Sequence, residues 1–335
     1  MRRIIVFGAM LGIAATAMAK YTGGFQARVT IEVVDEEGRP IPDARVGLDF
    51  NLGDPFPKGL TDNAGRFTAE GRTLGLISGG AGKEGYYGSW FRVDLDETLP
   101  KGVRVRRRYP DYTRRIVLRP IGNPVPMYAY EFHKCLPEEA EGVEVGFDFL
   151  KADWVAPYGK GETADVLICV TTFDPEKYDF HSGKIIWRFP RKGDGMVLVN
   201  PEDCWDNTAL TMPRFAPAEG YEPNWWDGKI RGLRKGFPED QRGPGKELAP
   251  FAPYFLRIRS ELDEHGNLVK ALYGKIIKRD YSIGWSPGFK NSPPTIAFIY
   301  YVNPDGTRNV EFDRKRNLFE GVLHPIEKYL LPQWP

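Results

Sequence analysis

The 335-residue chain carries 46 Lys and Arg residues against 45 Asp and Glu residues, a formal net charge of +1. Charges this evenly balanced give no overall attraction toward nucleic acid or an anionic membrane, so we expect no nucleic-acid partner. The length favours about two domains, each large enough to bury a hydrophobic core.

The N-terminus has the pattern of an export signal. Met1-Arg2-Arg3 precedes an apolar run from Ile4 to Ala15, and Ala17-Met18-Ala19 has the small-x-small form of a cleavage site. The apolar run is shorter than the roughly 20 residues that span a bilayer, so we interpret residues 1–19 as a secretory signal peptide. No later stretch is long and apolar enough to cross a membrane. We therefore expect an exported protein, periplasmic or extracellular, without a transmembrane segment after cleavage.

Residues 20–120 show the alternation typical of half-buried strands. Val29, Ile31 and Val33 alternate with polar residues, and the pattern resumes after a turn at residues 35–38 through Ala44–Phe50. Successive strand side chains point to opposite faces, so a period of two predicts one buried face and one wet face. Phe91, Val93 and Leu95 and the stretch 114–118 predict further strands. These strands predict a β-sandwich.

Two motifs in this region carry a resemblance. G-x-P-I-P-x-A-x-V lies at residues 38–46 and T-D-x-x-G-x-F at residues 61–67, followed by Lys83–Tyr86 and Ile116–Leu118. In this order, residues 26–120 resemble the carboxypeptidase regulatory-like domain, a seven-stranded transthyretin-like sandwich. The resemblance implies an accessory or structural module without catalytic residues of its own. The longer middle section, Gly71–Gly88, departs from the family pattern.

Residues 121–142, with Pro124 and Pro126, predict a connector, and a second β-rich domain is expected over residues 143–335. Its continuous apolar runs, Val166–Val170 and Thr295–Val302, are typical of strands covered on both faces. Periodicity disappears between Trp205 and Pro253, which predicts a long Trp/Pro-rich loop. The fold class is therefore all-β, a smaller sandwich followed by a larger sandwich-like domain.

Aromatic residues of the second domain are candidates for ligand binding. Trp154 and Tyr158 lie in a glycine-rich passage, and Trp225, Trp226 and Asp227 lie in the long loop. Aromatic faces bind the C–H side of sugars while nearby acids bind hydroxyl groups, so this mixture predicts a glycan ligand. In the alternative interpretation, the rings hold the long loop on the sandwich.

Motifs for catalysis and for cofactors are incomplete. The glycine-rich stretch 75–83 lacks the spacing of a phosphate-binding loop, and the H-x-x-E sequence at residues 324–327 has no third ligand for zinc. We expect no metal and no cofactor. A carboxylate pair for glycan hydrolysis needs no fixed spacing and remains an alternative. The acids considered for it are Asp148, Asp153, Glu162, Asp165 and Asp227.

Three cysteines, Cys135, Cys169 and Cys204, are an odd number for an oxidising compartment. One disulfide with one free thiol and three buried thiols are both compatible with their spacing. Taken together, the sequence favours a non-catalytic binding or structural protein of the cell envelope or extracellular space. Its expected partner is a glycan or another envelope protein. The alternative is a glycan-acting hydrolase, and assembly through an exposed sheet edge is a third hypothesis.

Overall fold

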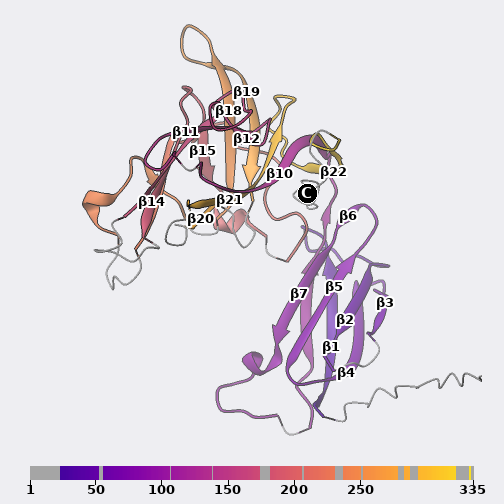
Figure 1. Ribbon diagram of the computed structural model, residues 1–335. Coiled ribbons are helices and arrows are strands. Elements are labelled where there is room, and N and C mark those ends of the chain that lie inside the picture. The colour runs from indigo at the N-terminus through magenta and orange to yellow at the C-terminus, as the bar shows by residue number, and fades with distance from the viewer. Residues whose placement is uncertain are drawn as a thin grey trace, which may run out of the picture. The chain divides into compact units, whose positions relative to one another are not determined.

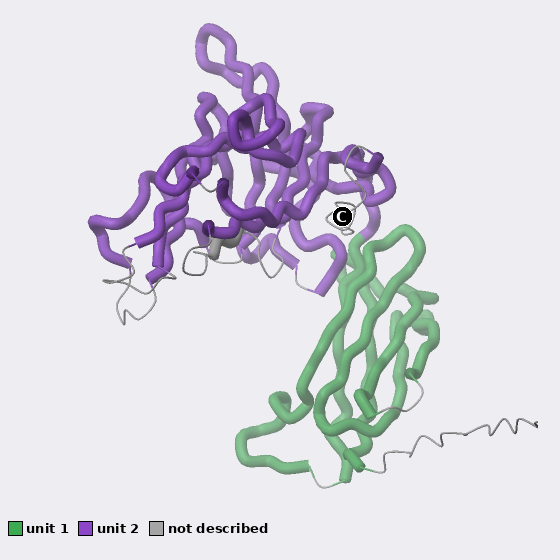
Figure 2. Tube along the Cα trace, viewed as in Figure 1, with its two compact units in different colours: residues 1–119 green, residues 120–335 purple. Residues whose placement is uncertain are grey.

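The computed structural model describes residues 23–52, 56–105, 107–137, 139–173, 182–205, 207–230, 237–249, 252–277, 283–286, 293–321 and 332. The expected signal peptide and the H-x-x-E sequence lie outside these residues. The chain divides into two compact units, Met1–Arg119 and Pro120–Pro335 (Figure 2). Each unit is described by itself below.

Unit 1 contains two sheets that share one hydrophobic core. Figure 1 shows β7, β5, β2 and β3 side by side in the larger sheet. The larger sheet has the order β3 (Lys58–Leu60), β2 (Arg45–Asp49), β5 (Leu76–Gly82), β7 (Ser89–Asp94), and the smaller sheet has the order β4 (Arg66–Thr73), β1 (Phe25–Val34), β8 (Tyr112–Val117). The short strands β6 (Tyr86–Tyr87) and β9 (Arg119–Pro120) pair with each other.

The alternation in the sequence sets the core of unit 1. Val29 and Ile31 of β1 are fully buried and share one cluster with Leu48 of β2 and Phe91 of β7. Their polar neighbours along each strand face outward, as a period of two requires. Gly65 closes the turn at residues 62–65 with φ +72°, a conformation that favours glycine. The prediction of an all-β fold is confirmed.

Unit 2 contains two larger sheets. The seven-stranded sheet has the order β15 (Gly195–Leu198), β18 (Tyr254–Leu262), β19 (Leu268–Ile276), β21 (Thr295–Asn303), β10 (Val125–Cys135), β22 (Phe312–Asn317), with β20 (Ile283–Ser286) also pairing with β21. The six-stranded sheet has the order β12 (Asp153–Trp154), β11 (Val145–Asp148), β13 (Val166–Thr172), β14 (Gly183–Arg188), β16 (Asn224–Lys229), β17 (Lys246–Glu247). Within the described residues, the remaining elements are three short 3-10 helices, η1 (Leu95–Thr98) in unit 1 and η2 (Pro201–Asp203) and η3 (Glu239–Gln241) in unit 2.

Aromatic side chains from both sheets of unit 2 form its main core. The rings of Phe132 and Phe147 lie 4.7 Å apart between centroids, and those of Trp187 and Phe298 lie 5.2 Å apart. A second cluster, which includes Met127, packs on the other side of the seven-stranded sheet. Among the described residues, no helix combines the length and hydropathy that crossing a membrane requires.

Two expectations about unit 2 were wrong in their local structure. The connector expected over residues 121–142 contains β10, an 11-residue strand that pairs with β21 and β22 inside the sheet. The loop expected between Trp205 and Pro253 contains β16, which pairs with β14. Pro126 conceals β10, because it sits at the irregular start of that strand where the register with β22 shifts. In β16 two adjacent tryptophans interrupt the alternation.

Candidate functional site

The aromatic rings expected to bind a ligand in unit 2 lie in the core. Trp154, Trp225 and Trp226 are 3%, 3% and 4% exposed. Trp225 packs edge-on against Tyr254 at 5.1 Å between ring centroids, and its indole N–H donates to the Glu222 carbonyl. A buried indole has no accessible face for a sugar ring. These three tryptophans therefore do not form the exposed platform that the sequence predicted.

The neighbouring residues of that expected site are consistent with packing. Trp226 contacts the Phe237 ring at 5.4 Å between centroids, and a Cβ at Gly243 would lie 2.5 Å from the Trp226 Cβ. Trp226 therefore holds the segment that follows β16 against the sheet, as in the alternative interpretation. Tyr158 is half-buried against the main core, and Asp227 is half-buried opposite Ile185. The structure does not bring these residues together on one open surface.

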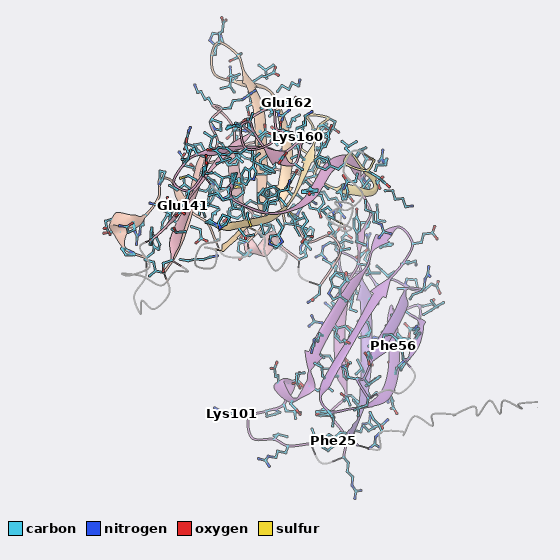
Figure 3. The ribbon with its side chains drawn as sticks, viewed as in Figure 1. Phe25, Phe56, Lys101, Glu141, Lys160 and Glu162 are labelled. Atoms are coloured by element: carbon cyan, nitrogen blue, oxygen red, sulfur yellow. The ribbon has the colours of Figure 1, made fainter. Side chains whose placement is uncertain are left out.

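Four of the five candidate acids lie near the corner between β11 and β12 (Figure 3 labels Glu162). Asp148 is buried and accepts hydrogen bonds from the backbone N–H groups of residues 150, 151, 162 and 163. Asp153 accepts from the N–H groups of Trp154 and Lys160. Glu162 is exposed and pairs with Lys151 at 3.1 Å. Asp227, the fifth acid, lies on β16.

Arg259 neutralises the buried acids of this corner. Its guanidinium donates to Asp148 at 2.8 Å and to Asp165 at 2.8 and 3.2 Å. Burial, with a smaller contribution from the Asp148 charge, raises the pKa of Asp165 to about 6, although the Arg259 guanidinium and the Phe149 N–H act in the opposite direction. A raised pKa beside a second carboxylate is typical of a catalytic pair. However, Asp148 and Asp165 are 1% and 2% exposed, so a polysaccharide has no access to them.

Metal ligands and disulfides contribute no further site within the described residues. No group of three or more His, Cys, Asp or Glu side chains there has an arrangement that could hold a metal ion. Cys135, Cys169 and Cys204 form no disulfide with one another, and Cys135 is exposed. Burial raises the pKa of the Cys169 thiol, which makes it a poor nucleophile.

The outward face of the larger sheet of unit 1 has a different character, because its centre lacks side chains. Gly47 of β2 pairs with Gly80 of β5, and the same row ends in Lys58 on β3 and Trp90 on β7. Three strand spacings separate the ends of this row, about 14 Å. We call this surface the glycine face; its residues are Phe56, Lys58, Arg45, Gly47, Asp49, Ser78, Gly80, Gly82, Trp90 and Arg92.

Two exposed aromatic rings border the glycine face. Phe56 is 46% exposed and Trp90 is 42% exposed. A Cβ at Gly47 would lie 2.7 Å from the Phe56 ring, so the missing side chain is what lets this ring lie over β2. The Lys58 ammonium lies 5.2 Å from the centroid of the same ring. A Cβ at Gly82 would meet no atom within 4 Å, which shows that the floor is open there.

Polar side chains occupy the rows on either side of the central row. Arg92 pairs with Ser78, which pairs with Asp49, and Arg45 lies opposite Gly82. A shallow surface of this kind offers rings for the C–H faces of a sugar and polar groups for its hydroxyls. Sequence reasoning missed Phe56 and Trp90. The alternation of β7 contains the signal for Trp90. Phe91 points inward, and successive strand side chains point to opposite faces, so Trp90 must lie on the outer face.

No family model matches the chain, and no curated protein matches it. Among solved structures, it is similar to 3-chlorocatechol 1,2-dioxygenase from Rhodococcus opacus, with 16% identity and a TM-score of 0.24. This likeness covers 30% of the chain and spans 61% of the dioxygenase.

Two other likenesses cover more of the chain. A DUF3823 family protein from Parabacteroides merdae is 7% identical, with a TM-score of 0.20, over 87% of this chain and 100% of that one. A protein of Bacteroides uniformis proposed to bind carbohydrate is 8% identical, with a TM-score of 0.18, over 83% and 99%. We draw no functional conclusion from likenesses this weak, and the carboxypeptidase regulatory-like assignment stays a prediction.

Proposed function

We propose that the protein is an exported, non-catalytic binding protein and that its ligand is a carbohydrate held on the glycine face. Export is supported by the signal pattern of residues 1–19. Binding is supported by one observation above all: Phe56 and Trp90 are exposed aromatic residues beside a floor formed by Gly80 and Gly82 of β5. Unit 1 would then be a carboxypeptidase regulatory-like sandwich whose outer sheet surface has acquired a ligand.

The physical basis of the proposal is the flatness of the floor. Side chains normally stand perpendicular to a sheet and prevent a ligand from approaching the backbone. Gly80 and Gly82 of β5 remove this obstacle in the middle of the face, while the Phe56 ring lies on Gly47. The flanking rings supply apolar contact area at low conformational cost. Sugar rings present a C–H face to the aromatics and hydroxyls to Ser78, Asp49 and the arginines.

The catalytic alternative has weaker support. Asp148 and Asp165 lie close together, but burial and complete hydrogen bonding leave them no surface for a substrate. Their arrangement suits a structural role, in which buried carboxylates are paired and hydrogen-bonded. We therefore do not propose hydrolysis.

Native affinity gels containing xylan, mixed-linkage β-glucan, galactomannan, polygalacturonate, alginate or dextran sulfate test the proposal on the full exported chain. We expect retardation by at least one polymer. Trp90→Ala should weaken the affinity for that polymer roughly tenfold, because an aromatic anchor of an interface contributes about 1–2 kcal/mol or more.

Phe215→Ala is the matched control, since Phe215 is an exposed aromatic residue (62%) that lies in unit 2. It should bind like the wild type. The proposal is wrong if no polymer retards the protein, or if Trp90→Ala and Phe215→Ala behave alike.

A further inference from the structure

The two outer surfaces of unit 1 differ in how their charges are paired. On the smaller sheet, Arg66 lies 2.9 Å and Arg115 3.7 Å from Glu32, while Arg28 lies 3.9 Å from Glu70. Arg108 pairs with Asp111 at 2.7 Å, and Thr30 and Thr68 share a hydrogen bond across the strands. These four arginines thus have carboxylate partners within the molecule, and Arg72 of the same surface donates to the carbonyls of Gly23 and Gly24.

The cations of the glycine face lack such partners among the described residues. Arg45, Lys58 and Arg92 are all exposed, and none forms an ion pair within 4 Å with a described acid. Asp49 is two strands away from Arg92, with Ser78 between them, and accepts the backbone N–H of Asn51. Asp94, two residues from Arg92 on the same side of β7, accepts the backbone N–H of Asp96. The face therefore carries three cations against two carboxylates, a small local excess of positive charge, although the whole chain is nearly neutral.

The two arginines stand at opposite corners of the floor. Arg45 of β2 lies in the Gly82 row and Arg92 of β7 lies in the Ser78 row. Two strand spacings and four residue rises along β5 separate them, about 16 Å between Cα atoms. A linear chain running from one arginine to the other crosses Gly80 and passes beside Trp90.

From this placement we propose that the ligand of the glycine face is an acidic polysaccharide whose sugar rings carry carboxylates, a uronate polymer. The inference rests on the proposed function and adds its ligand class. A planar guanidinium matches the two oxygens of a carboxylate, so Arg45 and Arg92 would each bind one uronate group. Because Asp49 lies among the cations, the face suits a ligand with one charge per ring better than a densely sulfated chain.

Affinity gels with four polymers test this inference on the full chain. Polygalacturonate and alginate carry uronate groups, fully methyl-esterified polygalacturonate keeps the same backbone without charge, and dextran sulfate replaces carboxylate by sulfate. We expect at least tenfold tighter binding to a uronate polymer than to the ester, with affinity falling as salt rises. The double variant Arg45→Gln/Arg92→Gln should lose at least fivefold in uronate affinity.

Arg66→Gln/Arg115→Gln, which makes the same change of charge on the opposite surface, should bind uronate like the wild type. The inference would be overturned if neither polygalacturonate nor alginate binds more tightly than the ester, if the Arg45→Gln/Arg92→Gln variant is unaffected, or if dextran sulfate binds more tightly than both uronate polymers. If binding depends on Trp90 but favours no uronate, only the ligand class is wrong. If no polymer binds in a Trp90-dependent way, the proposed function is wrong as well.

Discussion

Lys275 lies on β19 between Phe255 of β18 and Tyr301 of β21, inside the second core of unit 2. Its ammonium lies 4.9 Å from the centroid of the Tyr301 ring. Burial lowers its pKa to about 7, although the Glu311 charge acts in the opposite direction. Glu311 is itself bound by the N–H groups of Gly122 and Asn123. The lysine is thus a buried base whose charged form is costly.

The pH dependence of stability follows from this lysine. Between about pH 7 and 10.5 it is neutral in the folded chain and protonated in the unfolded chain, so unfolding takes up a proton. Its contribution to the free energy of unfolding therefore rises with pH through this window and is constant below it. We expect Lys275→Met to raise stability at pH 7 by about 1–4 kcal/mol, with a smaller gain at pH 10.

Denaturant unfolding of wild type and Lys275→Met at pH 7 and pH 10 measures this difference. A gain of the same size at both pH values would show that the lysine does not lose its proton on folding.

The tryptophans show how the same side chain takes different roles by position. Trp225 and Trp226 are adjacent on β16, so one faces the main core and the other faces the opposite side. Both are buried because later segments cover the outer side of that sheet near Phe237. Trp90 lies on β7, where the outward neighbours are glycines. The number of aromatic residues in a segment therefore does not show which of them is exposed. The strand register shows it, because it decides the side of the sheet on which each side chain lies.

At the scale of elements, β18 joins the two sheets of unit 2 through Arg259. The residue lies where the pairing of β18 with β19 shifts register, and its φ of 55° is unusual for a residue with a side chain. Asp194 accepts the backbone N–H groups of Arg259 and Ser260, which fixes this bend. The bend directs the guanidinium to Asp148 and Asp165, at the ends of strands of the other sheet.

Removing this cation should leave two buried carboxylates without a counter-charge. We expect Arg259→Met to destabilise the protein by about 3–5 kcal/mol at pH 7.5. The cost should be smaller at pH 5, because burial raises the pKa of Asp165 to about 6 and a protonated Asp165 needs no counter-charge. Chemical denaturation at the two pH values gives both numbers.

Arg66→Met provides the control for an exposed ion pair. Arg66 bonds Glu32 on the outer surface of unit 1, and losing such a pair should cost less than about 1 kcal/mol. If Arg259→Met lowers the free energy of unfolding by no more than this, or by the same amount at both pH values, Arg259 does not link the two sheets as described.

The strands that the sequence predicted and the strands that it missed differ in their pattern of polar and apolar residues. β1 and β2 were predictable because each has one wet and one dry face. β10 begins next to two prolines and β16 contains two adjacent tryptophans, so neither shows a period of two. β10 contributes to a core on each side of its sheet, and β16 places Trp225 in the main core and Trp226 against Phe237. Tertiary packing therefore determines both strands.

At the scale of the whole molecule, two units have separate cores and carry different kinds of polar chemistry. In unit 2 the buried charges, Lys275 and the Arg259 cluster, serve packing. In unit 1 the outer larger sheet leaves rings and cations exposed. The sequence allowed an all-β fold to be predicted, but the tryptophans that it favoured for ligand binding are buried in unit 2, because burial depends on strand register and on loops that cover a sheet. Export and ligand binding stay predictions.

Adding a side chain to the floor tests the location of the ligand most directly. Gly82→Tyr introduces a ring where a Cβ meets no neighbour within 4 Å, so the fold should be kept, which an unchanged melting temperature would verify. Thr113→Tyr adds the same ring to the exposed surface of β8, on the opposite sheet. In the affinity gels, we predict that Gly82→Tyr loses at least tenfold in affinity while Thr113→Tyr binds like the wild type. Undiminished binding by a folded Gly82→Tyr protein would contradict the glycine face as the carbohydrate site.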